Sequence, residues 1–301
     1  MITKMTAQPT KNLVFFCGNR SLVPIKIIDT IRQQINTHSL AINISAIIGN
    51  ADGQPQNQPG SQQTIVEYAQ AQQIPFVRLV KGVANNPIFI EELFKRYKPD
   101  WAMSLYCTEI FSQNFINHFE QVLNYHNGAL PQYKGVHATH WAIANGESHA
   151  GWRFHRVTKA LDGGNILSGG SVEILTGDTP ADLETKLLEQ ACVKIPEFLQ
   201  KLLTNDSGEK QTGPSSYYSH KDSQRARILP NPSDLTAQQL LNRVQAFSPV
   251  LVTLAQRNLT IKQARLIGTK NDKVNENKKS HHRITSSDGF IIELIEAEAT
   301  E

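Results

Sequence analysis

Short apolar runs alternate with amphipathic segments along the first two-thirds of the chain. Most of the runs end in glycine or polar turn residues, as buried parallel strands do, and we expect strands at 13–17, 42–48, 75–80, 101–105 and 122–125. Between them, apolar side chains recur at helical spacing, which predicts helices at 21–37 (with Ser21 as N-cap), 63–73 and 87–97. Alternation of this kind predicts an α/β fold, a parallel-rich twisted sheet with helices on both faces.

The pattern changes after a long predicted helix at 180–203, for which Thr179 is the expected cap. Residues 205–222 read NDSGEKQTGPSSYYSHKD, a polar stretch rich in turn formers that is typical of a linker. Beyond it come an amphipathic helix at 235–246 and short strand-like runs at 251–254, 259–261 and 290–294, which predict a small β-rich C-terminal domain. We therefore expect a main domain at 1–205, a linker at 206–224 and a small domain at 225–301.

The composition is that of a soluble globular protein in a reducing compartment. Apolar residues make up 40% and charged residues 19% of the 301 positions, and the net charge of +3 is too small to require a nucleic-acid partner. No apolar run approaches the roughly eighteen residues of a membrane span, and the run at 13–17 is too short for a signal peptide. The three cysteines have no metal or disulfide spacing. We expect a cytoplasmic protein that does not associate with membranes.

Chemistry concentrates where the last predicted strand of the sheet ends. Residues 124–135 read NYHNGALPQYKG, and Asn124 and His126 are two apart, so that both project to the same side of an extended segment. Asp162 follows 36 residues after His126 on the flexible turn LDGG. An amide donor, an imidazole that moves protons near neutral pH and a carboxylate that orients the imidazole suit acyl transfer to an amine.

Two further histidines raise the question of a metal. His137 and His140 follow the motif closely, but no carboxylate or third ligand stands at a matching spacing, and we expect no metal site. His155, at the end of the run GWRFH, could face either the site or the core, and the sequence leaves both open.

The motif resembles the signature of 10-formyltetrahydrofolate-dependent formyltransferases. The resemblance is carried by 124–135, by WAIANGE at 141–147 and by the GWRFH run that leads to LDGGNIL at 161–167. This family contains methionyl-tRNA, glycinamide ribonucleotide and amino-sugar formyltransferases, as well as formyltetrahydrofolate hydrolases. The resemblance implies a Rossmann-like formyltransferase domain over about 12–205, and a looser one over 226–249 implies the small C-terminal domain of some relatives.

The resemblance also implies roles for individual residues. Asn124, His126 and Asp162 would be the catalytic trio, and 10-formyltetrahydrofolate would be the cosubstrate. The cosubstrate would lie against the segment after the 101–105 strand and against the loop at 159–164, and the expected contacts are Leu105, Tyr106, Cys107, Lys159, Ala160, Leu161, Gly163 and Gly164. For the acceptor, we expect contacts with Asn127, Tyr133, Lys134 and His137, because the motif departs from its relatives at 127–129 and 136–139.

The loop at 50–64 favours a small amine as the acceptor. It contains no Lys or Arg, whereas phosphate contacts dominate nucleic-acid affinity. We therefore expect a nucleotide-linked amino sugar or a modified amino acid. The basic run from Lys270 to Arg283 keeps initiator methionyl-tRNA as an alternative. A formyltetrahydrofolate hydrolase and a non-catalytic folate- or nucleotide-binding protein are further alternatives, and the sequence leaves the oligomeric state open.

Overall fold

The computed structural model describes residues 9–18, 22–49, 63–254, 256–269 and 281–296. The predicted cap Ser21, most of the 50–64 loop and the run 270–280 lie outside these residues. The chain forms two compact units, and each is described by itself. Unit 1 comprises Met1–His126, Trp152–Gly170 and Leu188–Gly213, and unit 2 comprises Asn127–Gly151, Ser171–Leu187 and Pro214–Glu301.

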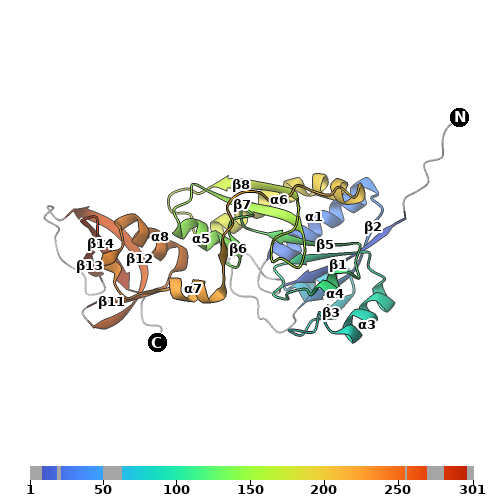
Figure 1. Ribbon diagram of the computed structural model, residues 1–301, viewed down its shortest axis with the longest axis horizontal. Coiled ribbons are helices and arrows are strands. Elements are labelled where there is room, and N and C mark those ends of the chain that lie inside the picture. The colour runs from blue at the N-terminus through green and yellow to red at the C-terminus, as the bar shows by residue number, and fades with distance from the viewer. Residues whose placement is uncertain (1–8, 19–21, 50–62, 255, 270–280, 297–301) are drawn as a thin grey trace. The chain divides into compact units, whose positions relative to one another are not determined.

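A seven-stranded, mostly parallel sheet has the strand order β3-β2-β1-β4-β5-β7-β8. Figure 1 labels most of its strands. Its strands are β1 (Lys11–Cys17), β2 (Ile42–Gly49), β3 (Phe76–Arg78), β4 (Trp101–Leu105), β5 (Gln121–His126), β7 (His149–Arg156) and β8 (Ile166–Glu173). The helices along this part of the chain are α1 (Leu22–His38), α2 (Ile65–Ala71), α3 (Pro87–Tyr97), α4 (Gln113–Ile116), α5 (Ala138–Ala144) and α6 (Pro180–Leu203). The predicted α/β fold is therefore confirmed.

Burial explains why the central strands read as unbroken apolar runs. Leu13 to Cys17 of β1 are at most 1% exposed, so both faces of this strand are covered. On one face, Val14 and Phe16 pack in a core with Ile90 and Leu93 of α3 and with Phe115 of α4. The strand order reverses at β1, whose two neighbours are β2 and β4. In sheets of this kind, ligands bind outside the carboxyl ends of the strands near such a reversal.

The C-terminal part of unit 2 contains a five-stranded sheet in the order β10-β11-β12-β14-β13. Its elements are β10 (Ile228–Leu229), η1 (Pro232–Asp234), α8 (Ala237–Phe247), β11 (Val250–Leu254), β12 (Arg257–Thr269), β13 (His281–Thr285) and β14 (Phe290–Glu296). Leu240 and Val244 of α8 are buried together with Ile261 of β12 and Ile292 of β14. The predicted β-rich C-terminal part is confirmed, but the sequence missed β13 and most of β12, whose polar residues hide the alternation of a strand with one exposed face.

The segment predicted as a linker contains regular structure. It includes β9 (Tyr217–Tyr218), which pairs in parallel with β6 (Lys134–Gly135), and most of α7 (His220–Ala226). Ser219 caps α7 through the Asp222 amide. Its residues up to Gly213 fold with unit 1. Serine, aspartate and glycine serve both as helix caps and as turn formers, so composition alone does not separate the two uses. The predicted domain boundaries remain a prediction.

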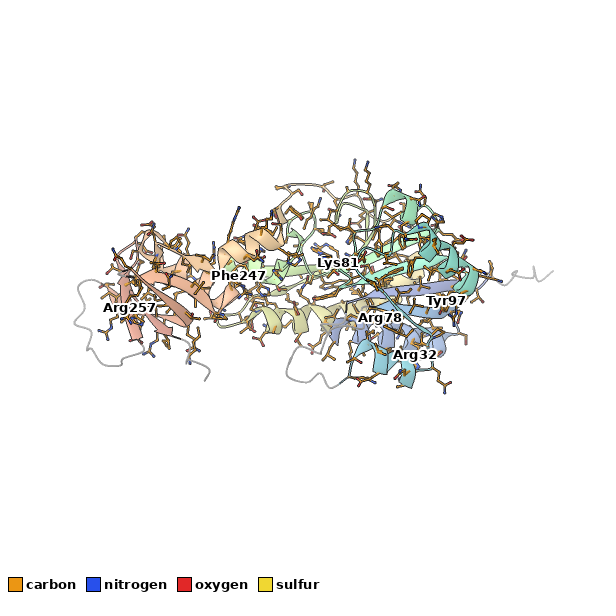
Figure 2. The ribbon with its side chains drawn as sticks, turned by 90° about the horizontal axis from the view of Figure 1, so that it is seen from below. Arg32, Arg78, Lys81, Tyr97, Phe247 and Arg257 are labelled. Carbon is orange, nitrogen blue, oxygen red and sulfur yellow. The ribbon has the colours of Figure 1, made fainter. Side chains whose placement is uncertain are left out.

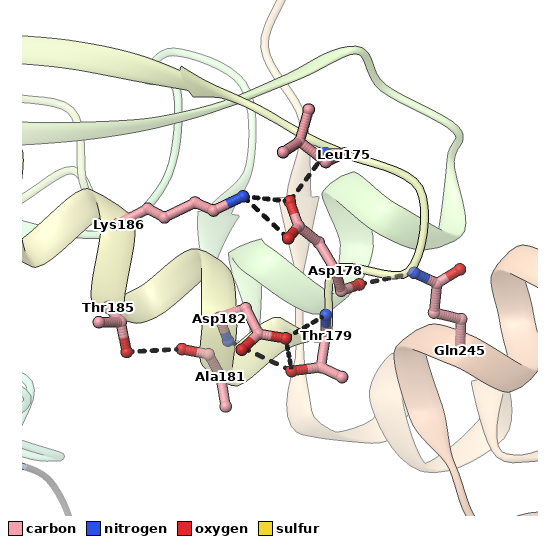
Figure 3. A network of polar contacts seen from close by, with 8 residues as sticks. All are labelled: Leu175, Asp178, Thr179, Ala181, Asp182, Thr185, Lys186 and Gln245. Atoms are coloured by element: carbon pink, nitrogen blue, oxygen red, sulfur yellow. Dashed lines mark hydrogen bonds and ion pairs between the residues drawn. The ribbon is translucent and has the colours of Figure 1, made fainter.

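Asp178 joins the start of α6 to α8 within unit 2 (Figure 3). Its carboxylate accepts hydrogen bonds from Lys186 Nζ at 2.6 and 2.8 Å and from the Leu175 amide at 2.7 Å, and its backbone carbonyl accepts one from Gln245 Nε2 at 2.6 Å. Next to it, Thr179 Oγ1 accepts a hydrogen bond from the Asp182 amide, which confirms the predicted cap of α6. These contacts fix the first turn of the long helix.

We expect Asp178→Ala to lower the free energy of unfolding by about 1–3 kcal/mol, because it leaves a partly buried ammonium group and an amide without their acceptor. Urea unfolding followed by circular dichroism measures the change. Glu197→Ala is the matched control, since the Lys194–Glu197 pair is 51% and 45% exposed and should contribute below about 1 kcal/mol. Equal effects of the two substitutions would contradict the structural role of Asp178.

Candidate active site

Strand β5 carries two of the predicted catalytic side chains. Asn124 and His126 lie in the last half of the strand, which pairs in parallel with β4 and antiparallel with β7. The Asn124 position is opposite His155, and His126 is opposite Arg153. His126 is 6% exposed. The spacing of two residues therefore places both side chains on one face of the sheet, as the sequence predicted.

His155 is directed toward this site, which resolves the question that the sequence left open. Its Nδ1 lies 2.8 Å from the Arg156 carbonyl oxygen, which only accepts hydrogen bonds, so Nδ1 carries the proton of the neutral ring. Its Nε2 then accepts the hydrogen bond from Asn124 Nδ2 at 3.1 Å. This contact fixes the amide orientation of Asn124 and leaves the second N–H of the same nitrogen for another acceptor. No signal in the single sequence distinguishes this direction from the core, because both faces of the sheet are buried.

Asp162 completes the group. Its carboxylate oxygens lie 4.0 Å from His126 Nδ1 and 3.6 Å from His155 Nε2, and its side chain is 10% exposed. These distances place the carboxylate beside both imidazole rings. The turn that presents Asp162 is constrained, since its φ of 48° lies in the left-handed region, which disfavours residues with a Cβ. The structure thus brings together Asn124, His126 and Asp162 and adds His155 to them.

The group contains the elements of acyl transfer. The amide N–H of Asn124 can donate to a carbonyl oxygen that gains negative charge, and the imidazole of His126 can accept and return a proton. The carboxylate of Asp162 can hold the ring in place and stabilise its positive charge. Within the described residues, no group of three His, Cys, Asp or Glu side chains could hold a metal ion.

The residues predicted to contact the cosubstrate lie in two segments of unit 1. Leu105 ends β4 and is buried, and Tyr106 and Cys107 follow it at the carboxyl edge of the sheet. A Cβ on Gly18 would lie 2.2 Å from the Tyr106 carbonyl oxygen, so glycine allows the backbones after β1 and β4 to approach each other. Burial raises the pKa of Cys107 to about 11, which keeps this thiol protonated and unreactive at neutral pH.

The second segment is the loop that carries Asp162. Lys159, Ala160 and Leu161 are exposed, and the Leu161 side chain retains 45% of its accessible surface. Gly163 and Gly164 are closely packed, because added Cβ atoms would lie 2.8 Å from Ala160 Cβ and 1.9 Å from the Arg156 carbonyl oxygen, respectively. The loop therefore combines a rigid base with an accessible apolar side chain.

The residues predicted to contact the acceptor lie in unit 2. Tyr133 is buried, and its hydroxyl donates to Glu147 Oε1 at 2.5 Å and accepts from Asn145 Nδ2 at 3.2 Å. Asn127 and Lys134 are partly buried, and His137 is exposed. Their contact with an acceptor remains a prediction.

His140 makes unit 2 sensitive to acid. Its ring lies 5.1 Å from that of His137 and 5.5 Å from that of Phe247, the buried last residue of α8 that Figure 2 labels. Burial, with smaller contributions from His137 and Arg227, lowers the pKa of His140 to about 4. Protons then bind preferentially to the unfolded chain, whose histidine titrates near 6.5. The contribution of neutral His140 to the free energy of unfolding is therefore fully present above pH 6.5 and is lost as the pH falls from 6.5 toward 4.

We expect this histidine to cost about 2 kcal/mol of stability at pH 5 relative to pH 7.5. Thermal unfolding of the wild type and of His140→Gln at both pH values measures the effect, because glutamine is polar and does not titrate. Acidification should lower the melting temperature of the variant less than that of the wild type. Identical pH dependence in the two proteins would remove His140 as the cause.

The chain belongs to the formyl transferase family. The model of that family, described as Formyl transferase, matches residues 11–199. Among curated relatives, GDP-perosamine N-formyltransferase of Brucella melitensis biotype 1 is 28% identical over 146 residues, which are 48% of this chain and 56% of that protein. Methionyl-tRNA formyltransferase of Borrelia hermsii is 29% identical over 161 residues, which are 53% of this chain and 52% of that protein. The chain thus spans about half the length of these curated relatives.

A solved structure agrees over most of the chain. The structure of an N-formyltransferase from Helicobacter canadensis in complex with folinic acid and dTDP-3-aminofucose covers 94% of this chain and 99% of its own, with a TM-score of 0.69 and 21% identity. At this identity the likeness demonstrates a shared fold. No helix in the described ranges has both the length and the apolar character needed to span a bilayer.

Proposed function

We propose that this protein is an N-formyltransferase that moves the formyl group of 10-formyltetrahydrofolate onto the primary amine of a small acceptor. The observation that carries the proposal is the cluster of Asn124, His126, His155 and Asp162 at the end of β5 in a chain of the formyl transferase family. These side chains are the donor, base and carboxylate that amide formation from a formyl carbonyl requires.

In this proposal each side chain of the trio has one task. Asn124 donates its free N–H to the formyl oxygen as negative charge develops there, while His155 holds the amide in that orientation. His126 takes the proton that the attacking amine gives up and supplies one to the leaving nitrogen. Asp162 stabilises the proton on His126 from 4.0 Å. The reaction is balanced, since one C–N bond forms, one breaks and the proton passes between two nitrogens.

The formyl donor would bind to unit 1. The segment 105–107 begins at the last residue of β4, next to the reversal of strand order, where ligands of such sheets bind. The exposed Leu161 on the loop 159–164 offers an apolar surface for the flat pterin ring. These two segments fit a folate, whose ring is apolar on its faces and polar at its edges.

For the acceptor we propose an amino sugar linked to a nucleotide. The names of the relatives support this class, since one acts on GDP-perosamine and one structure contains dTDP-3-aminofucose. The absence of Lys and Arg from 50–64 agrees with an acceptor smaller than tRNA. In this proposal Asn127, Tyr133, Lys134 and His137 contact the acceptor.

The test is to incubate the protein with 10-formyltetrahydrofolate and a panel of GDP- and dTDP-linked amino sugars. Absorbance reports tetrahydrofolate release, and mass spectrometry reports the formylated product. Formylation of a nucleotide amino sugar with turnover supports the proposal. Transfer only to initiator methionyl-tRNA would replace the acceptor class, and formate release without any amine would indicate a hydrolase. Folate binding without turnover would support a binding protein instead.

A further inference from the structure

Residues 206–211 lie against the turn that carries Asp162, and both segments belong to unit 1. Hydrogen bonds join residues 206–209 to residues on either side of that turn. Arg156 Nη2 donates to the Asp206 carbonyl oxygen at 2.5 Å, and Asn165 Nδ2 donates to the Ser207 carbonyl oxygen at 3.0 Å. Ile166 and Glu209 exchange two backbone hydrogen bonds of 2.8 Å. The 206–211 segment is therefore hydrogen-bonded to the chain on both sides of the turn.

Gln211 ends this series of contacts at the turn itself. Its Nε2 donates at 2.8 Å to the carbonyl oxygen of Asp162 and at 2.8 Å to that of Gly164. One side-chain nitrogen thus joins the two carbonyls that flank Gly163. This contact holds Asp162 at its φ of 48°, a conformation that persists only where neighbouring groups fix it.

The oxygen of the same amide makes no hydrogen bond within the described residues. Gln211 Oε1 is buried there without a hydrogen-bond partner, although Lys210 and Thr212 on either side are exposed. The two carbonyl acceptors fix the nitrogen toward the turn, so the oxygen cannot exchange places with it. A buried acceptor without a hydrogen-bond partner destabilises the folded protein. Gln211 is nevertheless held in this orientation by its two hydrogen bonds to the turn, which indicates that the position of the turn matters.

We propose that Gln211 is a positioning residue that fixes the Asp162 carboxylate relative to His126 and His155. The inference rests on the proposed function, because Asp162 has a catalytic task only there. Without the Nε2 contacts, the turn can relax toward ordinary backbone angles, which moves the carboxylate away from the two rings. The effect should appear in kcat more than in KM, since Gln211 reaches the reaction only through Asp162.

The test compares Gln211→Glu, which keeps shape but cannot donate to carbonyls, with Gln211→Ala and with the control Gln200→Ala on the exposed face of α6. We expect both Gln211 variants to lower kcat by about 10-fold or more with KM changed by less than about 3-fold. In an Asp162→Ala background, the same substitutions should change kcat by less than about 2-fold, because the positioned group is already gone. An equal loss in both backgrounds would overturn the proposal.

Hydrogen exchange gives a readout that needs no activity. Amides of residues 160–166 should exchange faster in Gln211→Ala than in the wild type, while those of β1 and β4 should not change. Unchanged exchange at 160–166 overturns the proposal whether or not the protein is active. If the wild type formylates no amine, the proposed function fails, and faster exchange would still support Gln211 as the residue that fixes the turn. If Gln211→Glu does not fold, Gln211→Ala carries both measurements.

Discussion

Asn124→Ala, His126→Ala and Asp162→Ala are each expected to lower kcat for formyl transfer by roughly 10²-fold or more. The first removes the N–H donor to the developing oxyanion, the second removes the group that moves the proton, and the third removes the carboxylate 4.0 Å from His126 Nδ1. The measurement is steady-state kinetics with saturating folate donor and the best acceptor from the panel. His38→Ala, on the exposed last turn of α1, is the control and should be fully active.

The three losses should not add, because the side chains act on one proton transfer and one oxyanion. A double variant of His126 and Asp162 is expected to be close to the His126→Ala variant alone. Near-normal turnover in Asp162→Ala would remove this carboxylate from the reaction and leave the Asn124–His155 pair with His126. Circular dichroism at the assay temperature separates loss of chemistry from loss of fold.

Gly164→Ala should impair both stability and activity. The added Cβ would lie 1.9 Å from the Arg156 carbonyl oxygen, far closer than non-bonded heavy atoms approach, and a backbone atom cannot rotate away. The turn must therefore shift, and Asp162 shifts with it. We expect a loss of about 2–3 kcal/mol in the free energy of unfolding and a fall in kcat of about 10-fold or more.

Gly163→Ala is the graded comparison for this prediction. Its added Cβ would meet Ala160 Cβ at 2.8 Å, a milder approach than the 1.9 Å at Gly164. Urea unfolding and steady-state kinetics should give a lower free energy of unfolding and a lower kcat for Gly164→Ala than for Gly163→Ala. Equal and small effects would mean that the turn adapts freely and that its close packing does not position Asp162.

The sequence predicted the strands of the sheet well where they are buried on both faces. The expected strand 101–105 and helix 180–203 match β4 and α6 residue for residue, because burial of both strand faces leaves an apolar run and helix burial leaves a periodic one. Prediction was poorer for β8 and β13, where polar and apolar residues do not alternate clearly. The placement of Asn124 and His126 on one face of β5 could also be expected, since side chains two residues apart on an extended backbone point to the same side.

By itself, then, the sequence determined the α/β class, the β-rich C-terminal part and the family, because each depends on local periodicity or on sequence motifs, and it nominated the three residues of the proposed trio. Only the tertiary structure decided what surrounds the trio. The pairing of β5 with β7 directs His155 to Asn124, and the return of the chain after α6 brings Gln211 to the turn of Asp162. The first contact joins residues 31 positions apart and depends on strand register, and the second joins residues 49 positions apart and depends on a polar segment without periodicity. No local sequence pattern encodes either of them.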